Sequence, residues 1–190
     1  MNPKAMNQGY RRLFWGTFFM LLWGGSDTTL PFLPGIIGLC CCLSGTGIIC
    51  AVSENRRFFL ARRWTQIGIG VWILQILVIV PFFIQRVPWE LRFLSYFLGA
   101  VIVIQIYSHI LIGAGELLGG SSQTYYTRCA AVFAGGCAAG TIAMMIDELY
   151  GSGEVVIGGW MINLLMLFYL GLAIWSMSLM AALRRSYPIL

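Results

Sequence analysis

The sequence predicts an all-α integral membrane protein, a bundle of six transmembrane helices with both termini in the cytoplasm. Three observations support this prediction. The 190 residues are 59% hydrophobic and only 10% charged, whereas soluble domains carry about 25% charged residues. Apolar runs of about 20 residues, the length that crosses a bilayer, recur along the chain. Lys and Arg gather in alternate connections. No polar stretch is long enough for a soluble catalytic domain, so we expect one transmembrane domain over residues 1–190.

Turn signals separate the six apolar runs. Pro31 and Pro34 interrupt the chain after the first run, because proline breaks a helix and suits the first turn of the next one. The glycine-rich stretches 119–124 and 151–154 separate the last three runs. The expected spans are residues 13–29, 34–53, 66–84, 93–118, 125–149 and 155–183.

The connector at residues 54–64, ENRRFFLARRW, is basic and aromatic. Its cations are Arg56, Arg57, Arg62 and Arg63. Eleven residues between two spans stay close to the lipid headgroups, so a nucleic-acid site is disfavoured. We expect an interfacial helix that binds anionic lipid headgroups, at about 1 kcal/mol per cation.

The distribution of cations predicts the orientation. Cytoplasmic segments tend to be rich in Lys and Arg. With both termini inside, the cytoplasmic segments hold ten of the twelve cations, and only Arg86 and Arg92 lie outside. The ten are Lys4, Arg11, Arg12, Arg56, Arg57, Arg62, Arg63, Arg128, Arg184 and Arg185. The outer side receives most of the acids, of which Asp27, Asp147 and Glu148 are candidates for binding a cation or a basic ligand. The alternative is that these carboxylates are simply hydrated.

The cysteines and sequence motifs do not indicate a metal or a cofactor. None of the six cysteines forms a C-x-x-C pair, and all lie in apolar runs, so we expect small buried hydrophobic side chains. Palmitoylation of Cys50 or Cys129 is the alternative. Walker, zincin, G-x-S-x-G and dinucleotide motifs are absent from the sequence.

The fourth expected span contains the main candidate site. Gln105, His109 and Glu116 lie within about 40° of one another on a helical wheel, spread over about 16 Å of helix axis. Ionisable residues inside a membrane are costly and indicate function by default. The functional interpretation is a proton relay or a polar lining for a ligand. The structural alternative is hydrogen bonding between helices, worth about 0.6 kcal/mol per bond.

The fifth expected span has small residues every four positions, and we expect this face to pack against another helix. The residues are Thr127, Ala131, Gly135, Ala139 and Ala143, with Gly136 and Gly140 beside them.

Residues 12–63 resemble the start of uncharacterised small membrane proteins of Gram-positive, Firmicutes-type bacteria. The matching residues are Leu33, Pro34, Ile37, Gly38, Ser53 and Phe58. Gly35 and Leu39 replace an Asp and a Tyr that are usual in that group. The resemblance implies a bacterial plasma-membrane protein and implies no activity.

These observations favour a non-enzymatic small-molecule binding or transport-accessory subunit that uses the polar side chains of the fourth span. Two alternatives stay open. One is a membrane-embedded Cys/His peptidase that pairs His109 with Cys129, and the other is a structural subunit of a larger complex. The expected partners are the lipid bilayer, and a membrane-protein partner or a second copy, with no nucleic acid and no cofactor.

Overall fold

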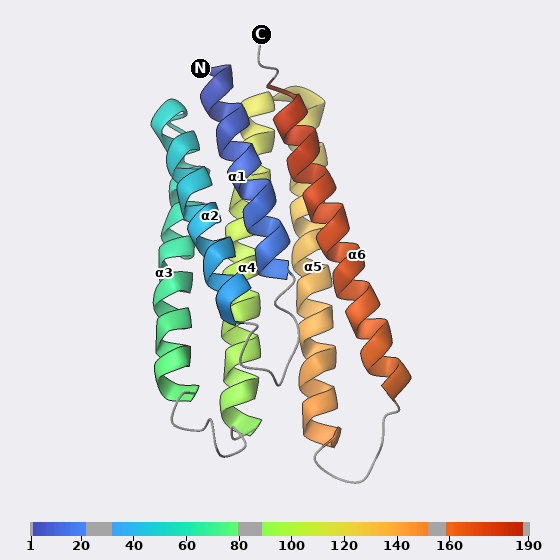
Figure 1. The fold of residues 1–190 in the computed structure, drawn as a ribbon. Coiled ribbons are helices and arrows are strands. Elements are labelled where there is room, and N and C mark those ends of the chain that lie inside the picture. Colours follow the sequence, from blue (N-terminus) through green and yellow to red (C-terminus); the bar gives the residue numbers. More distant parts are fainter. Residues whose placement is uncertain (1, 22–31, 80–88, 152–158, 188–190) are drawn as a thin grey trace.

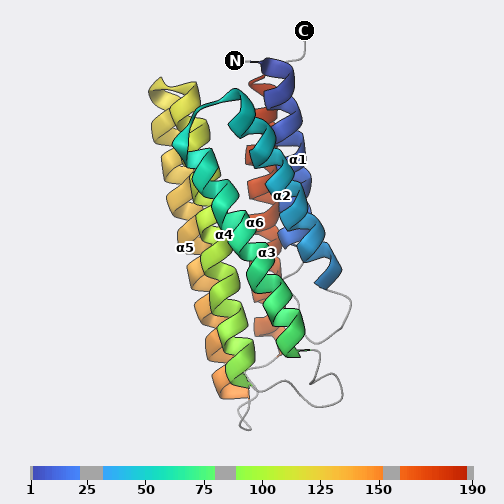
Figure 2. The ribbon, with the colours of Figure 1, turned by 90° about the vertical axis from the view of Figure 1, so that its left-hand side faces the viewer.

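Six helices run alternately up and down, and both termini lie at the same end (Figures 1 and 2). The computed structural model describes residues 2–21, 32–79, 89–151 and 159–187, and these contain no strand. The helices are α1 (Pro3–Leu21), α2 (Phe32–Val52), α3 (Arg56–Ile79), α4 (Trp89–Leu118), α5 (Gly120–Gly151) and α6 (Gly159–Arg185). The all-α prediction and the order of the helices are therefore confirmed.

Four helices are long and apolar enough to cross a membrane. Their candidate spans are Gly35–Val52, Phe93–Leu118, Gly120–Ile146 and Leu167–Arg185. The described parts of α1 and α3 are not apolar enough over the length that a membrane span needs. Charge explains the difference, because α1 carries Lys4, Arg11 and Arg12, and α3 begins with the four arginines of the expected connector.

That connector is continuous with the helix that follows it. We expected residues 54–64 to form an element of their own, but from Arg56 onward they are the first turns of α3. Only residues 53–55 link α2 to α3 outside a helix. The arginines consequently extend down the flank of α3, and Arg62 lies over Gly47 of α2, with Cζ 3.8 Å from an ideal Cβ at that glycine.

Close glycine contacts join α1 to α2. Gly9 and Gly16 are seven residues apart in α1, and Gly38 and Gly45 are seven residues apart in α2. An ideal Cβ on Gly45 would lie 2.9 Å from the carbonyl oxygen of Gly9, and one on Gly38 would lie 2.9 Å from that of Gly16. Small residues at such spacing let the two backbones approach closely. Each glycine therefore sits where a side chain would separate the helices.

The small-residue packing face expected in α5 is confirmed at Gly136 and Gly140 and not along the rest of the stripe. Thr127, Ala131, Gly135 and Ala139 are exposed, and a Cβ at Gly135 would meet no atom within 4 Å. The adjacent face makes the contact instead. A Cβ at Gly140 would lie 2.8 Å from the ring of Tyr169 in α6.

The C-terminal end of α6 is held by α1. The Nδ2 group of Asn7 donates hydrogen bonds to the carbonyl oxygens of Arg184 and Tyr187, both at 3.1 Å. The rings of Tyr10 and Tyr187 stack with centroids 5.7 Å apart. These contacts satisfy carbonyls that the end of a helix leaves without an intrahelical partner.

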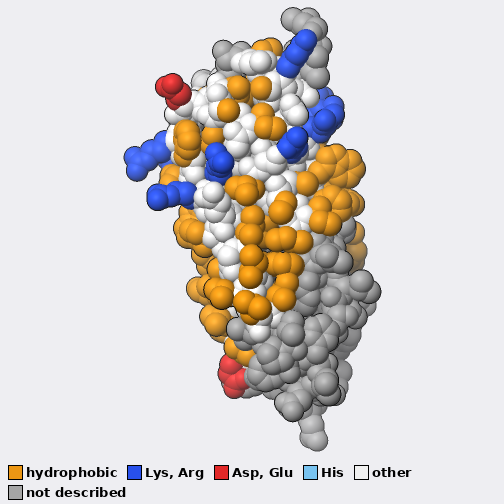
Figure 3. Space-filling model, turned by 60° about the vertical axis from the view of Figure 1, so that its left-hand side comes forward, with side chains coloured by type: hydrophobic (Ala, Val, Ile, Leu, Met, Phe, Trp, Pro, Cys, Tyr) orange, Lys and Arg blue, Asp and Glu red, His pale blue; other side chains and the backbone are white. Residues whose placement is uncertain are grey.

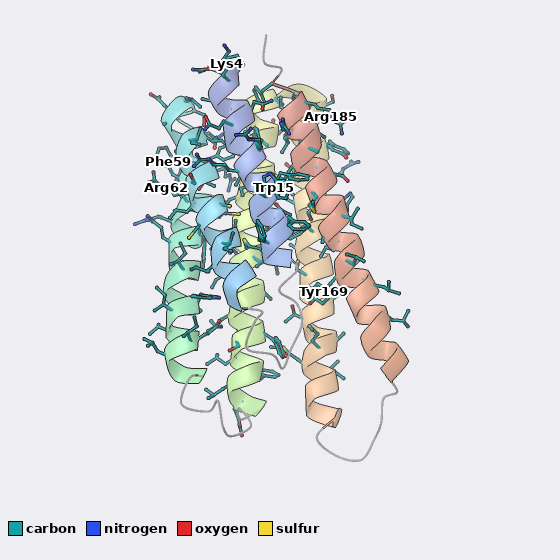
Figure 4. The ribbon with its side chains drawn as sticks, in the orientation of Figure 1. Lys4, Trp15, Phe59, Arg62, Tyr169 and Arg185 are labelled. Atoms are coloured by element: carbon teal, nitrogen blue, oxygen red, sulfur yellow. The ribbon has the colours of Figure 1, made fainter. Side chains whose placement is uncertain are left out.

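Cations gather at the end of the molecule where the termini lie, which we call the basic end. Figure 3 shows Lys and Arg side chains over the upper part of one face, with hydrophobic side chains below them. In Figure 4, Lys4 of α1 and Arg185 of α6 lie near this end, with Phe59 and Arg62 somewhat lower on α3. The sequence predicted that these cations lie together, and the helices bring them to one end of the molecule.

Candidate functional site

The best-defined polar site joins α3 to α4 at the basic end. The carboxylate of Glu116 accepts a hydrogen bond from Arg57 Nε at 3.1 Å and another from Asn55 Nδ2 at 2.9 Å. The Arg57–Glu116 contact is the one ion pair found among the described residues. Each carboxylate oxygen thus has one donor, and the acid and its two partners come from segments about 60 residues apart in the chain.

The turn between α2 and α3 places Asn55 and Arg57. Asn55 Oδ1 accepts a hydrogen bond from the backbone N–H of Arg57 at 2.7 Å, so Asn55 caps the start of α3. The same side chain bonds Glu116 through its amide nitrogen. One asparagine therefore fixes both the first turn of α3 and its position against α4.

A glycine in α4 allows the close approach of α3. An ideal Cβ at Gly113 would lie 2.9 Å from Cβ of Arg57 and 3.0 Å from Cε2 of Phe58. Phe58 is fully buried, while the Arg57 side chain beside it is 40% exposed. Phe58 thus anchors the start of α3 in the core, and the guanidinium of Arg57 stays at the surface.

A depression of about 470 Å³ lies beside the ion pair. It is lined by Arg56, Arg57, Leu60 and Glu116, and we call it the notch. It is an open depression at the surface, and it is lined by three charged side chains and one apolar side chain. Arg56 makes no hydrogen bond or ion pair within the described chain, so one guanidinium of the notch is uncompensated.

Glu116 is the one residue of the predicted α4 stripe that lines the notch, and the other two lie deeper on the same side of the helix. Gln105 and His109 are half-buried, and Glu116 is exposed. Positions 102 and 113, which contact α3, lie within about 40° of His109 on a helical wheel. The stripe therefore faces the α3 side of α4 rather than the centre of the molecule. Nδ1 of His109 is buried and has no hydrogen-bond partner.

Cys129, the residue that the peptidase hypothesis pairs with His109, lies on α5, and α5 packs against a different side of α4 from the one that holds His109. Cys129 is buried in α5. The α5-facing side of α4 includes Tyr107, whose ring centroid lies 4.9 Å from that of Phe133 and whose position is about 160° from His109 on the wheel. The described part of the chain shows no hydrogen bond between His109 and Cys129.

The acids that the sequence assigned to the outer side fall outside what the structure describes. Asp27 falls in the undescribed segment 22–31, and the side chains of Asp147 and Glu148 are also outside the described set. No group of three or more His, Cys, Asp or Glu side chains that suits a metal ion occurs among the described residues.

Sequence reasoning identified Glu116 and Arg57 separately and missed their pairing, along with Asn55, Leu60 and Gly113. The signal was present in part. A connection of three residues between α2 and α3, followed by a helix antiparallel to α4, brings Asn55 close to the end of α4.

The comparisons with known proteins give no further guidance: no family model matches the chain, and neither a curated protein nor a solved structure shows significant similarity to it.

Proposed function

We propose that this protein is a non-enzymatic membrane subunit that binds an amphiphilic small molecule along the α3-facing side of α4, as a binding or transport-accessory component. In this proposal all six helices cross a bacterial plasma membrane, and the basic end faces the cytoplasm. The excess of Lys and Arg at that end supports the orientation.

The observation that carries the proposal is the notch, together with the polar residues Gln105 and His109 on the same side of α4. An acidic or anionic headgroup fits the uncompensated Arg56 and the outer nitrogens of Arg57, whose Nε is bound to Glu116. The unpartnered Nδ1 of His109 lies seven residues deeper on the same side. Because this atom is itself buried, it marks the polar side of α4 and is not an open contact for the ligand.

The arrangement favours binding over catalysis. Glu116 is engaged by two donors, which suits an orienting role more than proton transfer. The peptidase alternative needs His109 beside Cys129, and the side of α4 that holds His109 packs toward α3, not toward α5.

Photocrosslinking of the purified full chain with a diazirine-bearing fatty acid tests the proposal. We expect the label on peptides of α3 and α4, and expect Glu116→Gln and His109→Ala to change the yield or the position of labelling. Arg56→Ala should lower the yield, while Arg128→Ala, which removes an exposed cation from α5, should not. Labelling spread over all helices in proportion to exposed surface would refute a defined site.

A further inference from the structure

We infer that the notch holds one phospholipid molecule by a monoanionic phosphodiester whose headgroup carries hydroxyls, as in phosphatidylglycerol. This inference rests on the proposed function and narrows its ligand to one lipid class.

The charge of the notch selects a monoanion. Arg56 and Arg57 supply two positive charges and Glu116 one negative charge, which leaves a single positive charge for the ligand to balance. A phosphodiester carries one negative charge. A phosphomonoester carries about 1.5 to 2 negative charges near neutral pH, and its second charge would face the Glu116 carboxylate.

The donors of the notch suit phosphate oxygens. Guanidinium groups present forked N–H donors that match phosphate geometry. Arg57 uses only Nε for Glu116, so both its terminal nitrogens stay available, and every N–H of Arg56 is unassigned within the described residues. The start of α3 adds a small positive potential at the same place.

Glu116 explains the preference for a hydroxylated headgroup. Each of its oxygens accepts one hydrogen bond from the protein, and a carboxylate oxygen has capacity for a second. Glycerol hydroxyls beside the phosphate donate such bonds. A choline headgroup has no N–H or O–H donor, so it leaves this capacity unused. An ethanolamine headgroup can donate to Glu116, but its lipid has no net charge and leaves the remaining positive charge of the notch unbalanced.

The position of the notch suits a lipid better than a soluble anion. Glu116 lies two residues before the end of the candidate span Phe93–Leu118, at the depth of headgroups. Leu60 lines the notch, and Ile67, which is 49% exposed, lies about two turns further along the same face of α3. These two side chains, with Arg63 between them in the chain, offer an acyl chain apolar contacts on the bilayer side of the phosphate site.

Native mass spectrometry of the full chain tests the inference. The detergent-purified protein is incubated with an equimolar mixture of phosphatidylglycerol, phosphatidylethanolamine, phosphatidylcholine and phosphatidic acid with identical acyl chains. We expect one retained phosphatidylglycerol per chain in preference to the other three. Arg56→Ala should lower its retention about tenfold, because hydrogen bonds to charged groups are lost. Arg63→Ala removes an exposed arginine of the same helix outside the notch and should have little effect.

A specificity change gives the sharpest readout. Glu116→Gln removes the negative charge and should raise retention of phosphatidic acid relative to phosphatidylglycerol. Equal losses in Arg56→Ala and Arg63→Ala would reduce the effect to diffuse attraction and overturn the inference, as would a preference for phosphatidylethanolamine. If the fatty-acid probe still labels α3 and α4 while no phospholipid is preferred, the lipid class is wrong and the proposed function stands. Failure of both measurements refutes both.

Discussion

Gly16 of α1 and Gly38 of α2 pack with backbone against backbone: a Cβ on either glycine would lie 3.0 Å or less from the carbonyl oxygen of the other. A similar relationship recurs one heptad away, where the corresponding distances between Gly9 and Gly45 are 3.2 and 2.9 Å. Backbone cannot move aside as a flexible side chain does, so the fit between α1 and α2 depends on these four glycines.

Gly38→Ala should therefore destabilise the protein. The added Cβ would lie 2.7 Å from the backbone nitrogen of Met20, which forces the helices apart, and overpacking of this kind costs about 1–3 kcal/mol. Thermal unfolding in detergent measures the loss. Gly70→Ala is the matched control, because it adds a Cβ with no atom within 4 Å, and it should leave stability unchanged or slightly higher.

Asn7→Ala should free the C-terminal end of α6. The substitution removes the hydrogen bonds to the carbonyls of Arg184 and Tyr187 and the one accepted from Arg184 Nε. The Arg184 carbonyl keeps the N–H of Tyr187 as a donor, whereas the Tyr187 carbonyl loses its donor, at a cost of about 1–3 kcal/mol. Hydrogen–deuterium exchange should rise in residues 182–187. Asn7→Asp should raise exchange less than Asn7→Ala, because a carboxylate cannot donate to a carbonyl but still accepts the hydrogen bond from Arg184 Nε.

The neighbouring residue supplies the control for this prediction. Gln8 is exposed on the same turn of α1, so Gln8→Ala should leave the exchange rates of residues 182–187 as they are. Unchanged exchange in both Asn7 variants would show that the stacked rings of Tyr10 and Tyr187 hold the segment without the asparagine.

Those two tyrosines predict a loss of stability in alkali. Burial raises the pKa of Tyr187 above its usual value near 10, and burial, with Tyr187 and Tyr126 nearby, raises the pKa of Tyr10 further. A raised pKa means that the folded state holds its proton longer than the unfolded chain does. The stabilisation is complete below about pH 10 and falls as the pH rises above it.

Removing the hydroxyls tests the cause of this pH dependence. Both hydroxyls are buried and have no hydrogen-bond partner among the described residues, so Tyr10→Phe and Tyr187→Phe should be neutral or stabilising at pH 8. The double variant should also lose less stability than the natural protein between pH 9 and 11. An equal loss would assign the alkaline effect to other groups.

Much of the helical organisation could be predicted because it depends on local signals. Apolar runs, prolines and glycine-rich turns gave six helices in the right order, and the arginines marked the basic end. A boundary was predicted at residue 64 and the structure has none there, because the charge of the sequence changes at that point while the helix continues. Hydropathy reports the preferred surroundings of a segment, and backbone hydrogen bonding decides where its helix stops.

Pairing between helices was harder to predict from the sequence. The small residues of α5 were expected to form a packing face, and only part of it does so: α6 packs against Gly136 and Gly140, while Gly135 is left open. The pairing of the α1 glycines with the α2 glycines, each pair seven residues apart, was not predicted, although it brings the two helices into backbone contact. The stripe of α4 was correctly placed on one side of its helix, and only the three-dimensional structure shows that this side faces α3.

Gly113→Ala should disrupt the notch without altering any of its charges. The new Cβ would lie 2.9 Å from Cβ of Arg57 and 3.0 Å from the ring of Phe58, so α3 must move away from α4. Because Arg57 and Glu116 are partly exposed, their ion pair contributes at most about 1 kcal/mol and cannot resist this shift. We expect fatty-acid crosslinking to α3 and α4 to fall. Gly99→Ala changes the same helix where nothing lies within 4 Å, and should preserve crosslinking; a loss in both variants would indicate a general effect on α4 and not on the notch.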